Sequence, residues 1–311
     1  MGIILEIIFP LFALVACGYV AGYARLINEA GIDGITNFVF YVAVPVLLFR
    51  SLARSDLLDP AALNIIFAYY GGVFSVFILA CLIGRVFFHL PIEEQAIMGM
   101  GACYSNTIFF GIPIVYTAYG EEAIFPLLII ITFNGLFLYP LIIFIISLGR
   151  REQGLARLKA AVQAMLRNPL VISVIIGSIW SLNGWGLSGA VDGFAKFLSS
   201  ATAPAALFAL GASLTVYRVA GSITESLVGV FLKLFILPLI VWYLAGAVFV
   251  LPPLWVAALT ITAAVPSGAN VYLTAQAYGV YIARASSVIL IGTVVSIVSV
   301  SALLAVLLAQ N

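Results

Sequence analysis

Two short stretches decide the fold of this chain: Cys103-Tyr-Ser-Asn-Thr-Ile-Phe-Phe-Gly-Ile-Pro113 and Ala263-Ala-Val-Pro-Ser-Gly-Ala-Asn-Val-Tyr272. Each of them interrupts an apolar run with proline, glycine and asparagine. Proline removes a backbone donor and clashes with the carbonyl four residues earlier, and an asparagine side chain competes for backbone hydrogen bonds. The two stretches therefore predict helices that are broken near residues 105–113 and 264–272.

The composition places these breaks inside a membrane. The chain is 64% hydrophobic and 8% charged, whereas a soluble domain is roughly half apolar and about a quarter charged. A soluble protein also needs a polar surface, so lipid must be the solvent for the excess of apolar side chains. The formal net charge of +1 gives no reason to expect a nucleic-acid partner.

The apolar runs predict an all-α protein with ten membrane-spanning helices, because about 20 apolar residues cross a bilayer. The predicted spans are 3–24, 33–54, 61–88, 93–118, 122–148, 168–184, 190–215, 224–250, 253–278 and 282–309. Lysine and arginine concentrate in the loops on one side of these spans, above all in loop 149–167. Cytoplasmic loops carry such an excess, so we expect both termini to lie outside the cytoplasm.

A repeat at an offset of 159 residues divides the chain (169 − 10 = 159 for its first pair). It relates Pro10 to Pro169, Gly18 to Gly177, Pro45 to Pro204 and Phe49 to Phe208. Each copy contains five predicted spans, so the second copy must enter the membrane from the opposite side, as in many secondary transporters. We expect one inverted repeat at 1–148, a cytoplasmic linker at 149–167 and the second repeat at 168–311.

The broken segments are the candidate binding site. Lipid does not tolerate free backbone groups, so we expect the breaks to line a hydrated cavity, although proline and glycine can also kink helices simply for packing. Pro113 and Pro266 suit the first turn of each resumed helix, whose positive N-terminus favours an anion such as a carboxylate. The candidate substrate-binding residues are Ser105, Asn106, Thr107, Gly111, Pro113, Pro266, Ser267, Gly268, Asn270, Tyr272 and Lys233.

Lys233 is a charged residue inside a predicted span, eight residues past Glu225. A charge at the bilayer centre costs about 2.5–3.5 kcal/mol on insertion scales and is often functional. The alternative is that its long side chain reaches the cytoplasmic interface, and the sequence favours neither reading.

The ionisable residues also bear on chemistry. Neither break contains a carboxylate, which disfavours a proton antiporter with a buried acid pair. An intramembrane enzyme would need a buried aspartate pair, a Ser–His dyad or a zinc cluster, and the sequence offers none of these. We therefore expect no enzymatic activity, no cofactor and no bound metal.

The chain resembles the auxin efflux carrier family, which holds plant auxin exporters and bacterial malate or malonate permeases. The matching stretches are FPLFALVACGYVAGY and NFVFYVAVPVLLFRSL near the start, SNTIFFGIP in the fourth span and AVPSGANVYLTAQAYG in the ninth. The resemblance implies a ten-helix fold shared with bile-acid:sodium symporters. In that fold helices 1, 2, 6 and 7 form a scaffold domain, helices 3–5 and 8–10 form a transport domain, and the broken helices 4 and 9 cross, here at Pro113 and Pro266.

The resemblance implies a secondary transporter in the bacterial cytoplasmic (inner) membrane. It would move a small organic anion, such as malate, malonate or an auxin-like acid, by alternating access. Two alternatives stay open: a sodium-coupled symporter of bile-acid-like anions, and a membrane sensor or scaffold that retains the transporter fold. The Gly18-Tyr-Val-Ala-Gly22 pattern permits close contact between helices. We expect it to pack this helix within the scaffold domain, and a homodimer that forms through the same domain is a further option.

Overall fold

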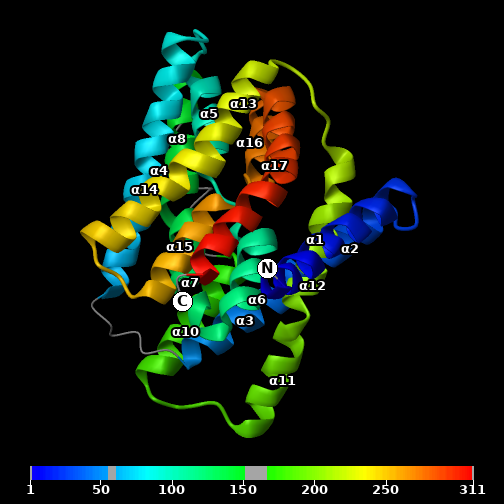
Figure 1. The fold of residues 1–311 in the computed structure, drawn as a ribbon, viewed down its shortest axis with the longest axis vertical. Helices are drawn as coiled ribbons and strands as arrows, with labels where there is room; N and C mark the ends of the chain where they lie inside the picture. The colour runs from blue at the N-terminus through cyan, green and yellow to red at the C-terminus, as the bar shows by residue number, and fades with distance from the viewer. Residues whose placement is uncertain (1, 55–60, 151–166, 310–311) are drawn as a thin grey trace.

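The computed structural model describes residues 2–54, 61–150 and 167–309, and the regular structure of these residues is helical (Figure 1). Among them, five helical stretches are long and apolar enough to cross a membrane: Glu29–Ala53, Leu63–Val86, Gly189–Val216, Ile223–Val248 and Ile282–Ala309. Shorter apolar helices lie in each of the other five predicted ranges. The chain is therefore an integral membrane protein, and most of the predicted linker 149–167 lies outside the described residues.

The first half of the chain runs from α1 to α8. Its elements are α1 (Gly2–Tyr23), α2 (Glu29–Phe38), η1 (Val39–Ala43), α3 (Val44–Ala53), α4 (Ala61–Val86), α5 (Ile92–Cys103), η2 (Thr107–Gly111), α6 (Ile112–Tyr119), η3 (Glu121–Ile124), α7 (Phe125–Phe133), η4 (Asn134–Leu138) and α8 (Tyr139–Arg150). Of the η elements, η3 is a 3-10 turn, whereas η1, η2 and η4 are π-helical turns inside longer helices.

The second half follows a similar order. Its elements are α10 (Pro169–Leu182), α11 (Gly189–Ser200), α12 (Thr202–Ser213), η5 (Leu214–Val216), α13 (Ile223–Phe231), η6 (Leu232–Ile236), α14 (Leu237–Tyr243), η7 (Leu244–Val248), α15 (Pro253–Ala264), α16 (Asn270–Tyr278) and α17 (Ile282–Ala309).

The π-helical turns explain how the helices accommodate proline. Pro45, Pro113, Pro140 and Pro238 each stand two residues after the end of such a turn. A proline ring clashes with the carbonyl of the preceding turn, and a π-bulge widens that turn locally. These four helices therefore continue through their prolines instead of ending there.

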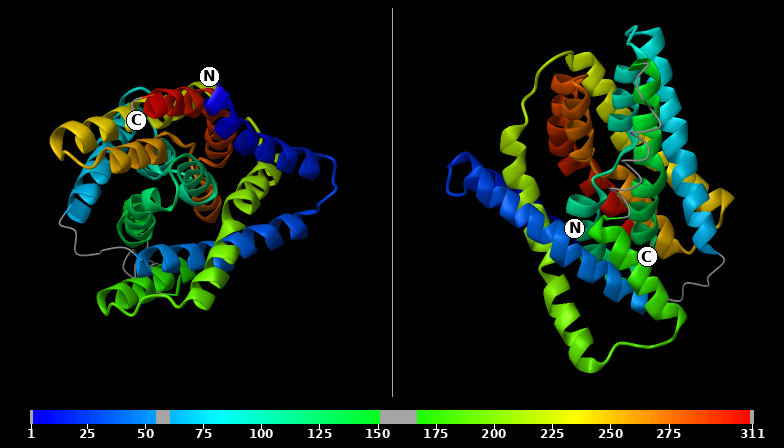
Figure 2. Two further views of the ribbon diagram at one scale, coloured as in Figure 1. Left: turned by 60° about the horizontal axis from the view of Figure 1, so that its bottom comes forward. Right: turned by 180° about the vertical axis from the view of Figure 1, so that it is seen from behind.

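Helices α1–α3 and α10–α12 pack against one another and form what we call the panel; α1 packs along α12, and α3 along α10. In Figure 2 the panel lies on one side of the other helices. Glycine residues allow the backbones of α1 and α12 to approach closely. A Cβ added at Gly18 would lie 2.0 Å from the Phe208 carbonyl oxygen, and a Cβ added at Gly211 would lie 1.9 Å from the Val15 carbonyl oxygen. Small residues allow such approach between membrane helices, so the Gly18 pattern serves packing within the panel.

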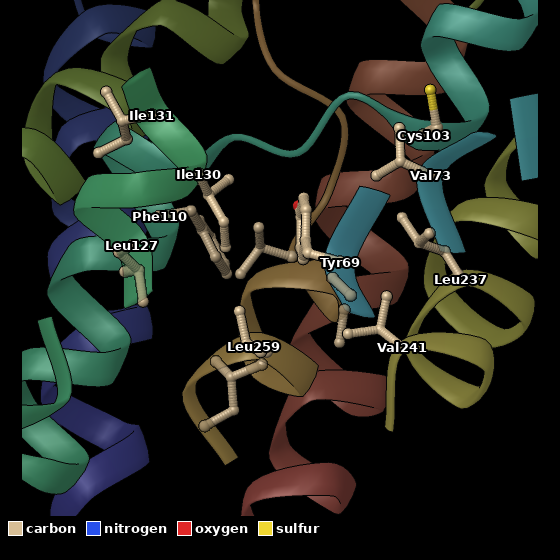
Figure 3. Close-up of a cluster of buried hydrophobic side chains, with 14 of the residues drawn as sticks. Tyr69, Val73, Cys103, Phe110, Leu127, Ile130, Ile131, Leu237, Val241 and Leu259 are labelled. Carbon is tan, nitrogen blue, oxygen red and sulfur yellow. The ribbon is translucent and has the colours of Figure 1, made fainter. Parts of the chain in front are cut away.

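Helices α4–α8 and α13–α17 form a second packed unit, which we call the bundle. Its interior is apolar and continuous, and Figure 3 shows Tyr69 amid the buried side chains of Phe110, Ile130 and Leu259. The panel meets the bundle where α12 contacts η2 and α6, and where α3 and α10 contact α7.

Candidate functional site: a crossing of two broken helices

Two helices of the bundle are interrupted, as the sequence predicts. The first leaves helical geometry at Tyr104 (φ −82°, ψ 100°) and resumes at Thr107. The second leaves it at Val265 (φ −67°, ψ 152°) and resumes at Asn270. The non-helical links are thus 104–106 and 265–269, so the first break is shorter than the predicted 105–113.

The two links pair with each other through their backbones. The Asn106 N–H donates to the Pro266 carbonyl at 2.9 Å, and the Gly268 N–H donates to the Tyr104 carbonyl at 3.0 Å. These bonds flank an isolated antiparallel bridge between Ser105 and Ser267. Part of the backbone freed by each break is therefore satisfied by the other break, rather than by water or substrate as we expected. The crossing is a fixed junction.

Two buried side-chain bonds hold this junction in place. The Ser267 hydroxyl donates to the Gly101 carbonyl at 2.6 Å, and the Ser105 and Tyr69 hydroxyls lie 2.9 Å apart. Ser105 is 2% exposed and Ser267 is 1% exposed, so neither hydroxyl faces open solvent. Of the predicted site residues, these two position the crossing.

The prolines do not lie where the sequence analysis puts them. Pro113 lies inside a helical run that begins at Thr107, just past the η2 turn, so it marks neither the break nor the crossing point. Pro266 precedes the resumed helix and contributes its carbonyl to the crossing. The helices cross at Ser105 and Ser267, because the η2 turn absorbs the strain of Pro113. Thr107 and Gly111 belong to the same buried turn.

The two asparagines of the breaks lie in different surroundings. Asn106 is 7% exposed, and its Oδ1 accepts a hydrogen bond from the Phe109 N–H at 3.4 Å, which caps the η2 turn. Asn270 is exposed at the start of α16, and its Nδ2 donates to the Tyr104 hydroxyl at 3.0 Å. Only Asn270 therefore presents an accessible amide beside a helix N-terminus.

Tyr104 and Asn270 form an accessible polar pair at the start of α16, which we call the polar patch. A second polar pair lies on a different face of α16, because residues two apart on a helix do not share a face; in it the Gln276 amide donates to the Tyr272 hydroxyl at 3.0 Å. Tyr104 and Gln276 were not predicted, but the spacing of Tyr272 and Gln276 (i, i+4) was a usable signal because such residues meet on one helix face. Tyr217 packs edge-on against Tyr272 with ring centroids 5.3 Å apart.

Lys233 also reaches the crossing region. It is 1% exposed, and its ammonium group donates to the Ala263 carbonyl near the end of α15. The reading in which this side chain extends to the interface is therefore wrong for this structure. Among the described residues, no carboxylate forms an ion pair with Lys233; those paired with arginine are Glu121 and Asp192 with Arg50, and Glu94 and Glu225 with Arg284.

Two grooves lie near the bundle, and their linings are mostly apolar. One of about 390 Å³ runs between α14, α15 and α17 and reaches Ala264. The other, of about 200 Å³, separates α3 and α10 of the panel from α4 and α7 of the bundle. Neither is lined by the polar patch, so the patch rather than a groove is the chemically distinctive surface.

An integral membrane protein with two broken helices that cross has a feature that is common in secondary transporters. The chain belongs to the membrane transport protein family, whose sequence profile matches residues 3–304. This match confirms the resemblance to the auxin efflux carriers, and the family and the first relative described below are transporters, not enzymes.

Two individual relatives are named as transporters and a third as a signaling protein. The chain is 26% identical to a candidate malonate transporter of Rhizobium meliloti (strain 1021) over 308 residues, 98% of this chain and 96% of that protein. It is 26% identical over 218 residues to an uncharacterized transporter of Methanocaldococcus jannaschii, covering 68% of this chain and 69% of the relative. A mouse lysosomal cholesterol signaling protein shares 26% identity over 215 residues, which are 24% of its length.

Proposed function

We propose that this protein is a secondary transporter that moves a small organic carboxylate across the bacterial cytoplasmic membrane, and that malonate is the first substrate to test. The observation that carries the proposal is the charge of the crossing: one buried ammonium at Lys233, an accessible amide at Asn270 and, among the described residues, no carboxylate paired with Lys233. A half-helix N-terminus adds about half a positive charge. Such a surface suits an anion, and the Rhizobium relative's name suggests which one.

The packing supports an arrangement of ten spans in two inverted five-helix repeats, 1–148 and 168–311. Gly18 abuts Phe208, and Gly177 abuts Phe49. The repeat offset converts one contact into the other, since 18 + 159 = 177 and 49 + 159 = 208. A pseudo-twofold relation between the repeats accounts for this reciprocity, and inverted repeats are common in secondary transporters. The basic linker 149–167 would then be cytoplasmic, with both termini on the other side.

In this proposal the panel is the scaffold domain (helices 1, 2, 6 and 7) and the bundle is the transport domain (helices 3–5 and 8–10). Alternating access would follow from movement of the bundle against the panel, with the crossing carried inside the bundle. The groove between α3, α10, α4 and α7 shows incomplete packing at their boundary. A homodimer would then form through the panel.

Uptake into proteoliposomes tests the function directly. We expect saturable uptake of labelled malonate by the purified chain, competed by malate more strongly than by an indole acid or a bile acid. Uptake that requires sodium would favour the symporter alternative. A protein that shows a cooperative thermal unfolding transition, and is therefore folded, but transports none of these carboxylates would favour a sensor or scaffold. That result would contradict the proposal.

Among the residues that the structure describes, one ion pair joins the two proposed domains. Arg50 on α3 is 3% exposed; its Nε lies 2.7 Å from Asp192 Oδ1 within the panel, and its Nη1 contacts the Glu121 carboxylate in η3 of the bundle. By contrast, Arg284 pairs with Glu94 at 3.0 Å and with Glu225 at 2.9 Å, and all three residues belong to the bundle. Movement of the bundle against the panel must therefore break or stretch the contact of Arg50 with Glu121.

We expect Glu121→Gln to loosen the boundary between panel and bundle. The glutamine keeps an acceptor but loses the charge, so the pair should weaken by ~1 kcal/mol, the upper end for a partly exposed pair. Amide hydrogen exchange in 44–53 and 121–133 should accelerate about fivefold. Glu94→Gln removes an ion pair inside the bundle and should leave these segments unchanged. Equal rates of amide hydrogen exchange in the two variants would show that the contact of Arg50 with Glu121 does not hold the panel and the bundle together.

A further inference from the structure

Lys233 satisfies a backbone carbonyl that the broken helix leaves free. In an unbroken helix, the Ala263 carbonyl would accept from the N–H of residue 267. The chain leaves helical geometry at Val265, and Ser267 instead forms the bridge with Ser105. The Lys233 ammonium donates to this carbonyl in place of the missing N–H. The lysine therefore replaces a donor lost when the helix broke.

The site is also electrostatically suited to a cation. Ala263 is the next-to-last residue of α15, a 12-residue helix, and the C-terminus of a helix carries about half a negative charge. Lys233 lies in the η6 turn, which packs against α15, α5 and α17. It is the only residue of this turn that can carry a positive charge. The turn thus delivers one ammonium to the negative end of the first half-helix.

The other half of the crossing has a neutral counterpart. There the Tyr69 hydroxyl on α4 meets the Ser105 hydroxyl of the first link. The crossing as described is therefore asymmetric: a hydroxyl pair supports one break and an ammonium supports the other. In ion-coupled carriers, unwound carbonyls and half-helix C-terminal ends coordinate the transported cation. Here an amino-acid side chain occupies a position of that kind.

We infer that Lys233 is a resident cation that takes the place of a coupling ion at the C-terminus of α15, so that this chain moves its anion without sodium. The inference rests on the proposed function for its consequence in transport, but the cation site itself can be tested without substrate. Lys233 acts here as a positioning residue, because it supports the crossing through the Ala263 carbonyl. Each anion carried would then move its own net charge across the membrane.

The test compares thermal unfolding of purified wild type, Lys233→Ala and Lys233→Met in choline, sodium and n-propylammonium chloride. Alanine leaves a space that n-propylammonium matches, because that ion replaces the atoms removed beyond Cβ. Methionine fills much of the same space without charge. We expect sodium or n-propylammonium to raise the midpoint of Lys233→Ala by about 3 °C or more, with no comparable rise for Lys233→Met or wild type. Lys196→Ala, at an exposed lysine on α11, should behave as wild type.

Two outcomes would overturn the inference. The first is a Lys233→Ala variant that responds to cations no more than Lys233→Met. The second is a wild-type protein that is stabilised by sodium or that needs sodium for malonate uptake. This wild-type measurement remains decisive even if the alanine variant does not fold. Failure of all carboxylates to be transported would instead count against the proposed function, and the cation rescue would still report on the site.

Discussion

Replacing Gly211 by alanine should force α12 away from α1 and destabilise the protein by about 3 kcal/mol or more, at or beyond the upper range for overpacking. The added Cβ would lie 1.9 Å from the Val15 carbonyl oxygen and 2.8 Å from its carbonyl carbon. Both are backbone atoms, so no side-chain rotation can relieve the clash. We expect the midpoint of thermal unfolding in detergent to fall by many degrees.

Gly34→Ala is the matched control for this prediction. Gly34 lies within α2 of the same panel, and a Cβ there would meet nothing within 4 Å. Alanine is favoured over glycine inside a helix by roughly 0.5–1 kcal/mol, so this variant should be as stable as wild type or slightly more stable. If Gly211→Ala unfolds at the same temperature as Gly34→Ala, the panel helices are not in the close contact described here.

The position of each break was predictable from sequence, but its extent was not. Both predicted ranges contain a real interruption, but only the second link, 265–269, contains proline and glycine; of the three residue types, the first link, 104–106, contains asparagine alone. Pro113 was assigned to the break because a proline inside a helix is costly. The η2 turn removes that cost, and no pattern in the sequence predicts such a π-bulge. The crossing point was therefore misplaced by several residues.

The partners of the site residues were beyond sequence reasoning for a different reason. Tyr104 and Asn270 are 166 positions apart, and their contact depends on the way the two links pair. The direction of the Lys233 side chain depends on the η6 turn, which alters the helical register of the residues around it. The sequence could place an intramembrane lysine but could not decide between the interface and the crossing.

The same limit applies to the two asparagines of the breaks. Each occupies a break of one repeat, so the sequence predicts the same role for both. In the structure Asn106 is buried and caps a turn, whereas Asn270 is exposed at the start of α16. The repeat offset does not relate these two residues to each other, since 106 + 159 = 265 and 270 − 159 = 111, so Asn106 corresponds to Val265 and Asn270 to Gly111.

Asn270→Ala should therefore weaken malonate binding with little loss of stability. A hydrogen bond to a charged group such as a carboxylate contributes about 1.5–3 kcal/mol, which corresponds to roughly 10- to 150-fold in affinity. Stability should largely persist because the side chain is exposed and its hydrogen bond to Tyr104 is a surface bond. Asn106→Ala should lower the unfolding midpoint as well, since loss of a helix cap costs about 1 kcal/mol. Titration calorimetry and the malonate-induced thermal shift measure the two effects separately.

The control for this pair is Asn183→Ala. Asn183 is an exposed asparagine at the end of α10, where its Nδ2 bonds only the Ile179 carbonyl at 2.7 Å among the described residues. It resembles Asn270 in exposure and in having one amide hydrogen bond, but it lies outside the polar patch, so its replacement should leave malonate affinity unchanged. If Asn270→Ala and Asn106→Ala both bind malonate as tightly as Asn183→Ala, the anion does not bind at the crossing. The accessible polar face of α16 would then serve only to hydrate the start of that helix.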